Sequence, residues 1–146
     1  MTDQVHTSIE GRCLCAAVRV ELDQPANQVE ICQCTMCRRW GGAFYSALSG
    51  SRFTIHGEDA IGVYRSSAWA ERAFCKACGT SLWFKFLPTG NRSFSAGLFD
   101  EATGLEVEKE IFVDEAARWT CIAGEHPRLT GEEIIAEAKA AGFSFD

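Results

Sequence analysis

Apolar and polar residues alternate along much of the chain, which is the pattern of half-buried β-strands. Residues 18–22 read VRVEL, and in residues 82–86 every second residue is a leucine or phenylalanine. Gly- and Pro-containing turn sequences separate such segments, as in an all-β or mainly β fold. The predicted strands are residues 18–22, 29–32, 43–48, 52–56, 61–65, 72–74, 82–86, 93–98 and 108–113.

The pattern changes near the C-terminus, where residues 130–142 are predicted to form one short helix. Thr130 followed by Glu133 is a capping-box sequence, and Gly142 suits the position just after a helix ends. Ile134 belongs to an apolar face on this helix. We interpret the helix as a lid packed on the sheet.

Length and composition are those of a globular protein, with 146 residues, 47% apolar and 23% charged. No linker or repeat divides the sequence, so residues 1–146 are predicted to be a single domain. A protein with a net charge of −6 lacks the excess of basic residues that is typical of general nucleic-acid binders. The polar N-terminal residues do not resemble a secretory signal, and no apolar run is long enough for a membrane span. These features predict a soluble cytoplasmic protein that binds neither nucleic acid nor membrane.

Eight cysteines without a secretory signal favour metal thiolates over disulfides. A C-x-C on a strand places both sulfurs on one face, and C-x-x-C-G is typical of a zinc knuckle whose glycine takes a positive φ. We interpret Cys121, between aromatic and aliphatic neighbours, as a buried core residue. The cysteines form four groups: Cys13 and Cys15; Cys32, Cys34 and Cys37; Cys75 and Cys78; and Cys121.

The spacing leaves two ways to share the cysteines between metal ions. One alternative is a four-thiolate site of Cys13, Cys15, Cys75 and Cys78 beside a three-thiolate site of Cys32, Cys34 and Cys37. The other joins Cys34 and Cys37 to Cys75 and Cys78 as an ordinary zinc ribbon. Local geometry favours the first, because it keeps the triplet whole and leaves complete pairs.

The number of ligands distinguishes the two sites of the favoured alternative. Four protein ligands make a closed, structural zinc site, whereas three leave a position for water or substrate. We therefore expect two Zn²⁺ ions per chain, the second being the more labile. A fourth ligand to the triplet could come from His126, His56 or Cys121, although none has zinc-binding spacing.

Three motifs resemble those of the glutathione-dependent formaldehyde-activating enzyme family, whose domain also occurs in centromere protein V. They are G-x-C-x-C at residues 11–15, C-x-C-x-x-C-R-R-x-x-G at 32–42 and C-x-x-C-G at 75–79. The stretch IFVDEAARW at 111–119 is similar to the family's final strand and turn, and Gln33 stands where many relatives have histidine.

The resemblance implies an Mss4-like fold of twisted antiparallel sheets clasped by a structural zinc. It implies that Cys13, Cys15, Cys75 and Cys78 hold that zinc, and that Cys32, Cys34 and Cys37 hold the catalytic one. The implied activity is that of a carbon–sulfur lyase resembling S-(hydroxymethyl)glutathione synthase, which adds a small-molecule thiol such as glutathione to formaldehyde.

An anionic zinc–thiolate site needs a cationic neighbour, and Arg38 and Arg39 directly follow Cys37. One of them is predicted to face substrate carboxylates or a developing oxyanion, or else to steady the sulfurs by N–H···S bonds. Arg65 and Arg72 are weaker candidates at strand edges. The aromatic residues that could line a pocket or fill the core are Trp40, Phe44, Tyr45, Trp83 and Phe84.

Two other functions are compatible with the sequence. One is a non-catalytic, zinc-stabilised Mss4-like binding module, in which both metals are structural. The other is methionine sulfoxide reduction, for which Cys121 would be the nucleophile, although its apolar neighbours give no reason for a depressed pKa.

Overall fold

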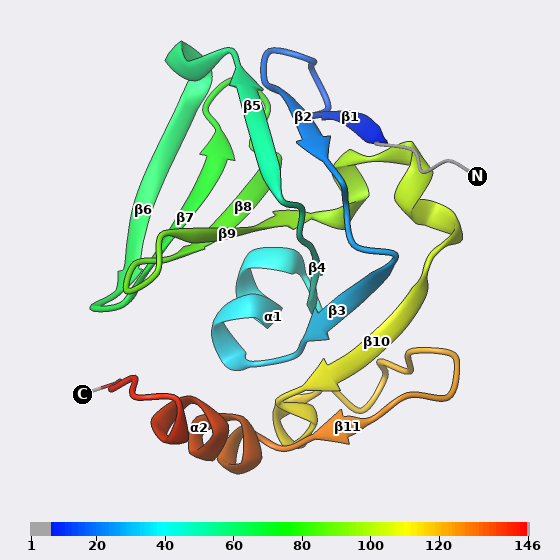
Figure 1. Cartoon of the computed structure of the whole chain (residues 1–146), viewed down its shortest axis with the longest axis vertical. Helices are drawn as coiled ribbons and strands as arrows, with labels where there is room; N and C mark the ends of the chain where they lie inside the picture. The colour runs from blue at the N-terminus through cyan, green and yellow to red at the C-terminus, as the bar shows by residue number, and fades with distance from the viewer. Residues whose placement is uncertain (1–6, 146) are drawn as a thin grey trace.

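The computed structural model describes residues 7–145 and consists mainly of β-structure, as predicted. Its strands form a three-stranded and an eight-stranded sheet, and a short helix ends the chain (Figure 1). Within the described residues, no helix is long and apolar enough to span a membrane.

The smaller sheet has the strand order β1-β2-β5 and is antiparallel throughout. Its strands are β1 (Ser8–Arg12), β2 (Arg19–Asp23) and β5 (Arg52–His56). The alternation at residues 18–22 predicted β2, but β1 was not predicted because its inward positions include Gly11. A Cβ on Gly11 would lie 2.7 Å from the Phe99 ring, so the missing side chain permits close packing.

The larger sheet has the order β11-β10-β3-β4-β9-β8-β7-β6. Most pairs are antiparallel, but β10 pairs in parallel with both β3 and β11, which differs from the expected antiparallel arrangement. Its strands are β3 (Gln28–Cys32), β4 (Tyr45–Leu48), β6 (Ile61–Ser67), β7 (Ala70–Cys75), β8 (Ser81–Phe86), β9 (Asn91–Ser95), β10 (Glu106–Ile111) and β11 (Arg128–Leu129).

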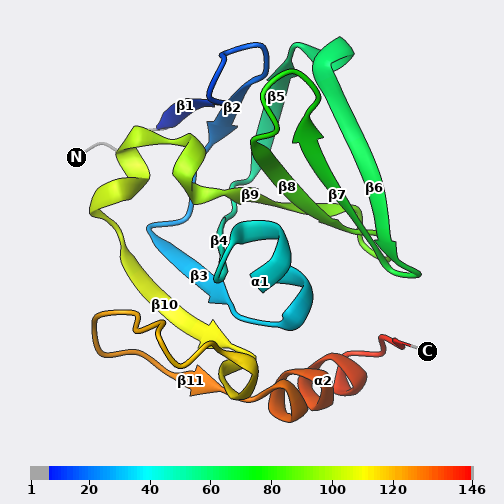
Figure 2. The same cartoon turned by 180° about the vertical axis from the view of Figure 1, so that it is seen from behind.

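Two α-helices lie beside the larger sheet. Figures 1 and 2 show α1 (Thr35–Gly41) next to β3 and β4, and α2 (Gly131–Ala140) near the C-terminus. The predicted capping box of Thr130 and Glu133 at the start of α2 is confirmed. Short 3₁₀ turns connect other elements at Glu58–Ala60 (η1), Ala96–Leu98 (η2), Asp100–Gly104 (η3) and Val113–Glu115 (η4).

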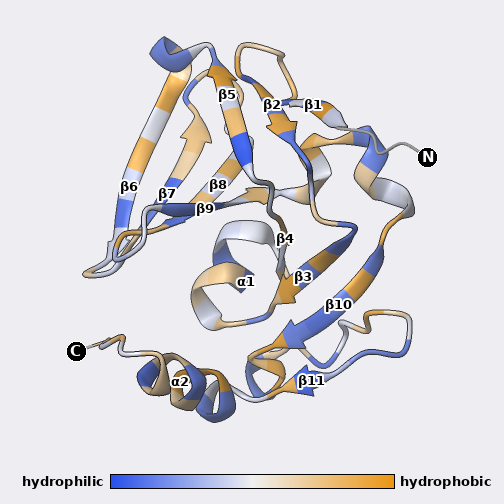
Figure 3. Cartoon of the chain, viewed as in Figure 1, coloured by the Kyte–Doolittle hydropathy of each residue, from blue (hydrophilic) through white to orange (hydrophobic). Residues whose placement is uncertain are grey.

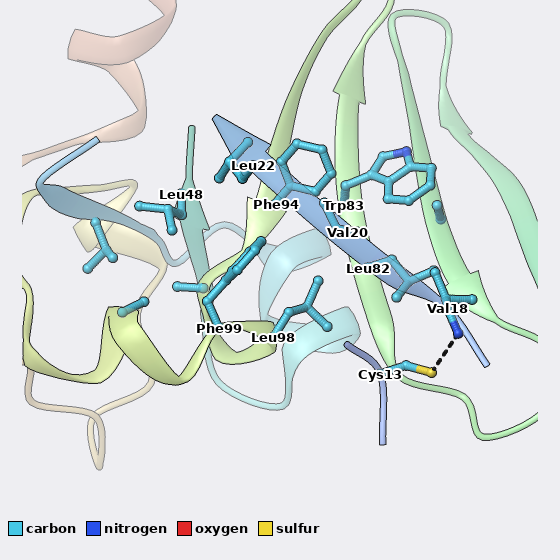
Figure 4. Packing of buried hydrophobic residues seen from close by; sticks show 14 of the residues in the cluster. Cys13, Val18, Val20, Leu22, Leu48, Leu82, Trp83, Phe94, Leu98 and Phe99 are labelled. Atoms are coloured by element: carbon cyan, nitrogen blue, oxygen red, sulfur yellow. Dashed lines mark hydrogen bonds between the residues drawn. The ribbon is translucent and has the colours of Figure 1, made fainter. Parts of the chain in front are cut away.

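The main core lies between the two sheets. Figure 4 shows Val18, directly before β2, and Val20 and Leu22 of β2 against side chains that include Trp83 and Phe94. Trp83, one of the aromatic residues that could line a pocket or fill the core, is buried in the core although it alternates with Leu82 and Phe84. The pairing of β7 with β8 shifts register beside Trp83, and this irregularity allows consecutive residues to face the core.

Candidate metal centre

Four cysteines meet where the two sheets approach each other. Cys13 and Cys15 lie just after β1, whereas Cys75 ends β7 and Cys78 lies in the turn before β8. Their sulfurs all lie within 4.8 Å of one another. We call this set the four-cysteine cluster. It connects the small sheet to the large one.

The distances in the four-cysteine cluster fit zinc. The sulfurs of Cys13 and Cys15 are 3.7 Å apart, and those of Cys15 and Cys75 are 3.8 Å apart. Thiolates on tetrahedral zinc, with bonds of about 2.3 Å, are separated by about 3.8 Å. The same distances are far longer than the roughly 2 Å of a disulfide bond.

Backbone and hydroxyl groups near Cys75 and Cys78 fix the turn and favour the thiolate form that binds a metal cation. Gly79 has a φ of +82°, as predicted for C-x-x-C-G, and its N–H donates to the Cys75 carbonyl at 2.7 Å. The Thr80 hydroxyl lies 3.1 Å from the Cys78 sulfur and, together with backbone hydrogen bonds from Thr80 and Cys15, lowers the pKa of Cys78 to about 5. A thiol with a lowered pKa is more readily the thiolate that binds metal.

The other three cysteines form a separate group at the start of α1. Cys32 ends β3, Cys34 is the N-cap of α1, and Cys37 lies one turn into that helix. Their sulfurs also lie within 4.8 Å of one another, and we call them the cysteine triplet. This is the grouping that local spacing favoured, and it leaves no pair available for the zinc-ribbon alternative.

The helix α1 was not predicted, and it changes how the triplet is built. The Cys34 sulfur accepts a hydrogen bond from the Cys37 N–H at 3.3 Å, as serine does at other N-caps. The Cys32 thiol, then Cys37 and the backbone N–H groups of this first turn, lower the pKa of Cys34. Neither C-x-C motif has both cysteines in a strand, so the alternation argument was wrong.

The three suggested fourth ligands lie elsewhere. His56 pairs with Glu21 across β2 and β5, and His126 pairs with the buried Glu110. Cys121 is exposed rather than buried in the core, contrary to the prediction. Within residues 7–145, the triplet therefore groups three metal-ligating side chains and no fourth.

A cavity of about 420 Å³ adjoins the triplet and is lined by all three of its cysteines. Its other walls come from β3, β4, β7 to β10, η4 and α2, and they include Tyr45 and Phe84 among the predicted aromatic residues. Trp83 lies instead in the main core, and Phe44 packs against that core. The triplet thus forms part of the wall of a cavity and is not enclosed in the protein core.

Arg72 is the arginine that contacts the triplet. Its side chain projects from β7, and its Nη1 lies 3.6 Å from the Cys37 sulfur. The residue is only 4% exposed, and its guanidinium lies over the rings of Trp40 and Phe84 at 5.0 and 5.2 Å. From the sequence, Arg72 was only a weak candidate, because the alternation of residues gives no information on contacts between β7 and α1. In the structure, Arg72 contacts Cys37 and Trp40 of α1.

Arg38 and Arg39 lie in the last turn of α1 and do not line the cavity. Arg39 is exposed and donates a hydrogen bond to the Thr35 carbonyl at 3.2 Å, whereas Arg38 is half-buried. No N–H···S contact from either side chain occurs within the described part of the chain. Their role toward a substrate stays a prediction.

Arg72→Lys is expected to lower the zinc affinity of the triplet by about 10–100-fold, because groups that contact metal ligands typically contribute this much. Lysine would lose both the planar contact with Trp40 and Phe84 and the N–H directed at Cys37. Competition with a chromophoric chelator measures the affinity. Arg65→Lys is the control, because Arg65 is exposed and bonds only backbone carbonyls of the Ser67–Ala68 turn. Equal affinities in the two variants would contradict the assignment.

Known proteins resemble this chain in fold and in sequence. A protein of Rhodobacter sphaeroides, known from its crystal structure, shares the fold with a TM-score of 0.55 and 20% identity; the match covers 82% of this chain and 99% of that one. An uncharacterized lyase of Schizosaccharomyces pombe is 29% identical over 128 residues, covering 86% of this chain and 93% of the relative.

Two further matches concern formaldehyde chemistry. A Halomonas elongata protein, provisionally named as a glutathione-dependent formaldehyde-activating enzyme, is 33% identical over 85 residues, which are 51% of this chain and 54% of that protein. The family model described as glutathione-dependent formaldehyde-activating enzyme matches residues 8–115, which include seven of the eight cysteines. The chain belongs to the glutathione-dependent formaldehyde-activating enzyme family.

Proposed function

We propose that the chain is a zinc-dependent enzyme of the carbon–sulfur lyase type, which joins a thiol to formaldehyde or a related aldehyde, or reverses that step. The observation that carries the proposal is a group of three cysteines, with no fourth described ligand, opening on a cavity beside a buried arginine. A lyase among the relatives and the name of the family support the reaction class. Glutathione or a similar thiol would be the nucleophile.

The donor set of the triplet fits zinc, since clustered thiolates are its usual ligands and three of them leave one position open. Zinc bound there would supply Lewis acidity, which lowers the pKa of an entering thiol or polarises an aldehyde oxygen. The four-cysteine cluster would hold a structural zinc. This division of roles follows from the number of ligands in each group.

The side chains around the triplet would hold the reacting groups in a defined electrostatic environment. The Arg72 guanidinium offsets the negative charge concentrated on the sulfurs, and it acts where water is largely excluded. Burial raises the pKa of Tyr45, so its phenol stays neutral and donates to the Ser93 carbonyl. Tyr45 thereby remains a fixed wall beside Cys34 and Cys37.

The reaction is tested by NMR exchange between formaldehyde and glutathione, with and without the zinc-loaded protein. We expect the protein to raise the exchange rate above the spontaneous rate, and Cys34→Ser to remove that enhancement. Cys121→Ser is the matched control, because Cys121 is exposed and belongs to neither group. Full enhancement in Cys34→Ser would exclude the triplet from the reaction and favour the binding-module alternative.

A further inference from the structure

The cavity beside the triplet is apolar over most of its lining. Its walls include Trp69, Phe84 and Phe86 from the β7–β8 side, and Ile134 and Ile135 from α2. Cavities of this size, about 300–1,000 Å³, commonly bind small molecules. The mostly apolar walls are complementary to a carbon chain or ring rather than to a strongly hydrated group.

The C-terminal segment from Gly131 to Phe145 closes one side of this cavity, and we call it the C-terminal wall. Beyond α2, the ring of Phe143 contacts that of Phe86 at 5.1 Å between centroids, and Phe145 contacts Trp69 at 5.2 Å. Phe145 itself lines the cavity. The start of α2 is fixed by the Gly131 N–H, which donates to Asp114 in η4 at 2.8 Å.

Few charged side chains line the cavity. Glu30 and Glu115 are both in the lining, and Arg72 is the one cation among the described lining residues. Arg72 contacts Cys37 and two aromatic rings, and its buried Nε has no hydrogen-bond partner. A charged group of the substrate would therefore find its cation beside the triplet, whereas the rest of the lining is mostly apolar and is complementary to an uncharged group.

We propose that the substrate at the triplet carries an uncharged apolar group, alkyl or aromatic, which is buried against the C-terminal wall. This inference rests on the proposed thiol–aldehyde addition and names the class of substrate for it. In the reaction R–SH + R′–CHO → R–S–CH(OH)–R′, a sulfur–carbon bond forms, the carbonyl π bond breaks and the thiol proton ends on oxygen. No oxidant or reductant is required. The apolar group is either R on the thiol or R′ on the aldehyde.

Two series of substrates distinguish these sources, with NMR exchange measured on the zinc-loaded full chain. In one, 2-mercaptoethanol is combined with formaldehyde, propanal, butanal and pentanal. In the other, formaldehyde is combined with glutathione and with ethanethiol, propanethiol, butanethiol and pentanethiol. We expect KM in one series to fall about 4-fold for each added methylene, since burial of a methylene contributes about 0.8 kcal/mol. The series that shows the trend identifies the partner that carries the apolar group.

Variants of the C-terminal wall test where the group is bound. Ile134→Ala and Phe145→Ala are expected to weaken the dependence of KM on chain length. Trp119→Ala should leave it unchanged, because Trp119 is 74% exposed and does not line this cavity. A binding measurement independent of turnover follows the methyl signals of Ile134 and Ile135 while benzyl alcohol is added. We expect these signals to shift, and those of Ile55, in β5, to remain in place.

The outcomes separate this inference from the proposed function. Catalysed exchange of glutathione and formaldehyde with no dependence on chain length in either series would overturn the inference and leave the function intact. Absence of catalysis with every pair, together with shifts of the Ile134 and Ile135 methyls by benzyl alcohol, would overturn the function and keep the apolar site. Absence of both effects would overturn both.

Discussion

Cys75→Ser is expected to unfold the protein at physiological temperature. Cys75 is fully buried, ends β7 and lies 3.8 Å from the Cys15 sulfur, so it belongs to the connection between the two sheets. Structural zinc contributes about 10–16 kcal/mol of apparent binding free energy in zinc-finger peptides. This is comparable to the total stability of about 5–15 kcal/mol of most domains.

The packing around the four-cysteine cluster explains why the loss should spread through the molecule. The Cys13 sulfur accepts a hydrogen bond from the Val18 N–H at 3.3 Å, directly before β2, which forms one side of the core (Figure 4). The Leu14 N–H donates to the Thr80 hydroxyl at 3.1 Å, which also joins the two sheets. Both contacts depend on the turns that the sulfurs hold together.

Circular dichroism and urea titration of zinc-loaded protein measure the effect. Cys121→Ser is the control and should change the free energy of unfolding by no more than about 0.5 kcal/mol, as exposed substitutions usually do. Addition of a strong chelator to the parent protein should reproduce the unfolding seen in Cys75→Ser. A Cys75→Ser variant with the parent's urea midpoint would show that this cluster does not hold the sheets together.

The second large effect is expected at Glu110, in β10. Its side chain is 4% exposed, and its carboxylate contacts three side chains through hydrogen bonds or ion pairs. Gln33 Nε2 lies 2.5 Å from Oε1, and His126 Nε2 and Arg128 Nε lie 2.6 and 2.8 Å from Oε2. Because Gln33 stands between Cys32 and Cys34, this buried network lies directly behind the triplet.

Glu110→Ala is expected to lower the free energy of unfolding by about 3–5 kcal/mol, because it leaves buried polar partners without their carboxylate. It should also weaken zinc binding by the triplet, since Gln33 loses the partner that orients the backbone between two ligands. Urea titration and chelator competition measure the two effects.

Glu108→Ala is the matched control on the same strand, because Glu108 is exposed. We expect this change to alter stability by no more than about 0.5 kcal/mol. Similar stabilities of the Glu110 and Glu108 variants would refute the structural role of the network. A destabilised Glu110→Ala protein with unchanged zinc affinity would separate the network from the triplet.

The burial of Glu110 illustrates what the sequence could not predict. Residues 106–111 read EVEKEI, so alternation places Glu110 on the same outward face as Glu106 and Glu108, and Figure 3 shows how hydrophilic this strand is. Glu110 is buried because β11 pairs with the end of β10 and brings Arg128 and His126 toward it. Such long-range pairing leaves no local signal in the sequence.

The triplet was predictable in composition but not in its local structure. Spacing alone favoured Cys32, Cys34 and Cys37 as one group, because short spacings restrict which sulfurs can meet. The seven-residue helix α1 was missed, since it has a cysteine rather than serine or aspartate at its N-cap. Gly42, whose φ of +96° ends the helix, was the signal that could have indicated it.

The C-terminal helix was predicted well as an element and incompletely as part of the site. The capping sequence located its start, because capping depends only on neighbouring residues. We interpreted the helix as a lid on the sheet, but its residues Ile134 and Ile135 also line the cavity beside the triplet. Which surface a helix covers depends on tertiary packing, and an apolar face is compatible with either role.

The central claim is that the cysteine triplet keeps one metal position open for a thiol. Cadmium NMR of the cadmium-substituted protein tests it directly, because each site gives its own resonance and the shift depends on the number of sulfur ligands. We predict one four-sulfur resonance that thiol does not affect, and one three-sulfur resonance that moves to the four-sulfur region when thiol is added. Two four-sulfur resonances before any thiol is present would contradict the claim.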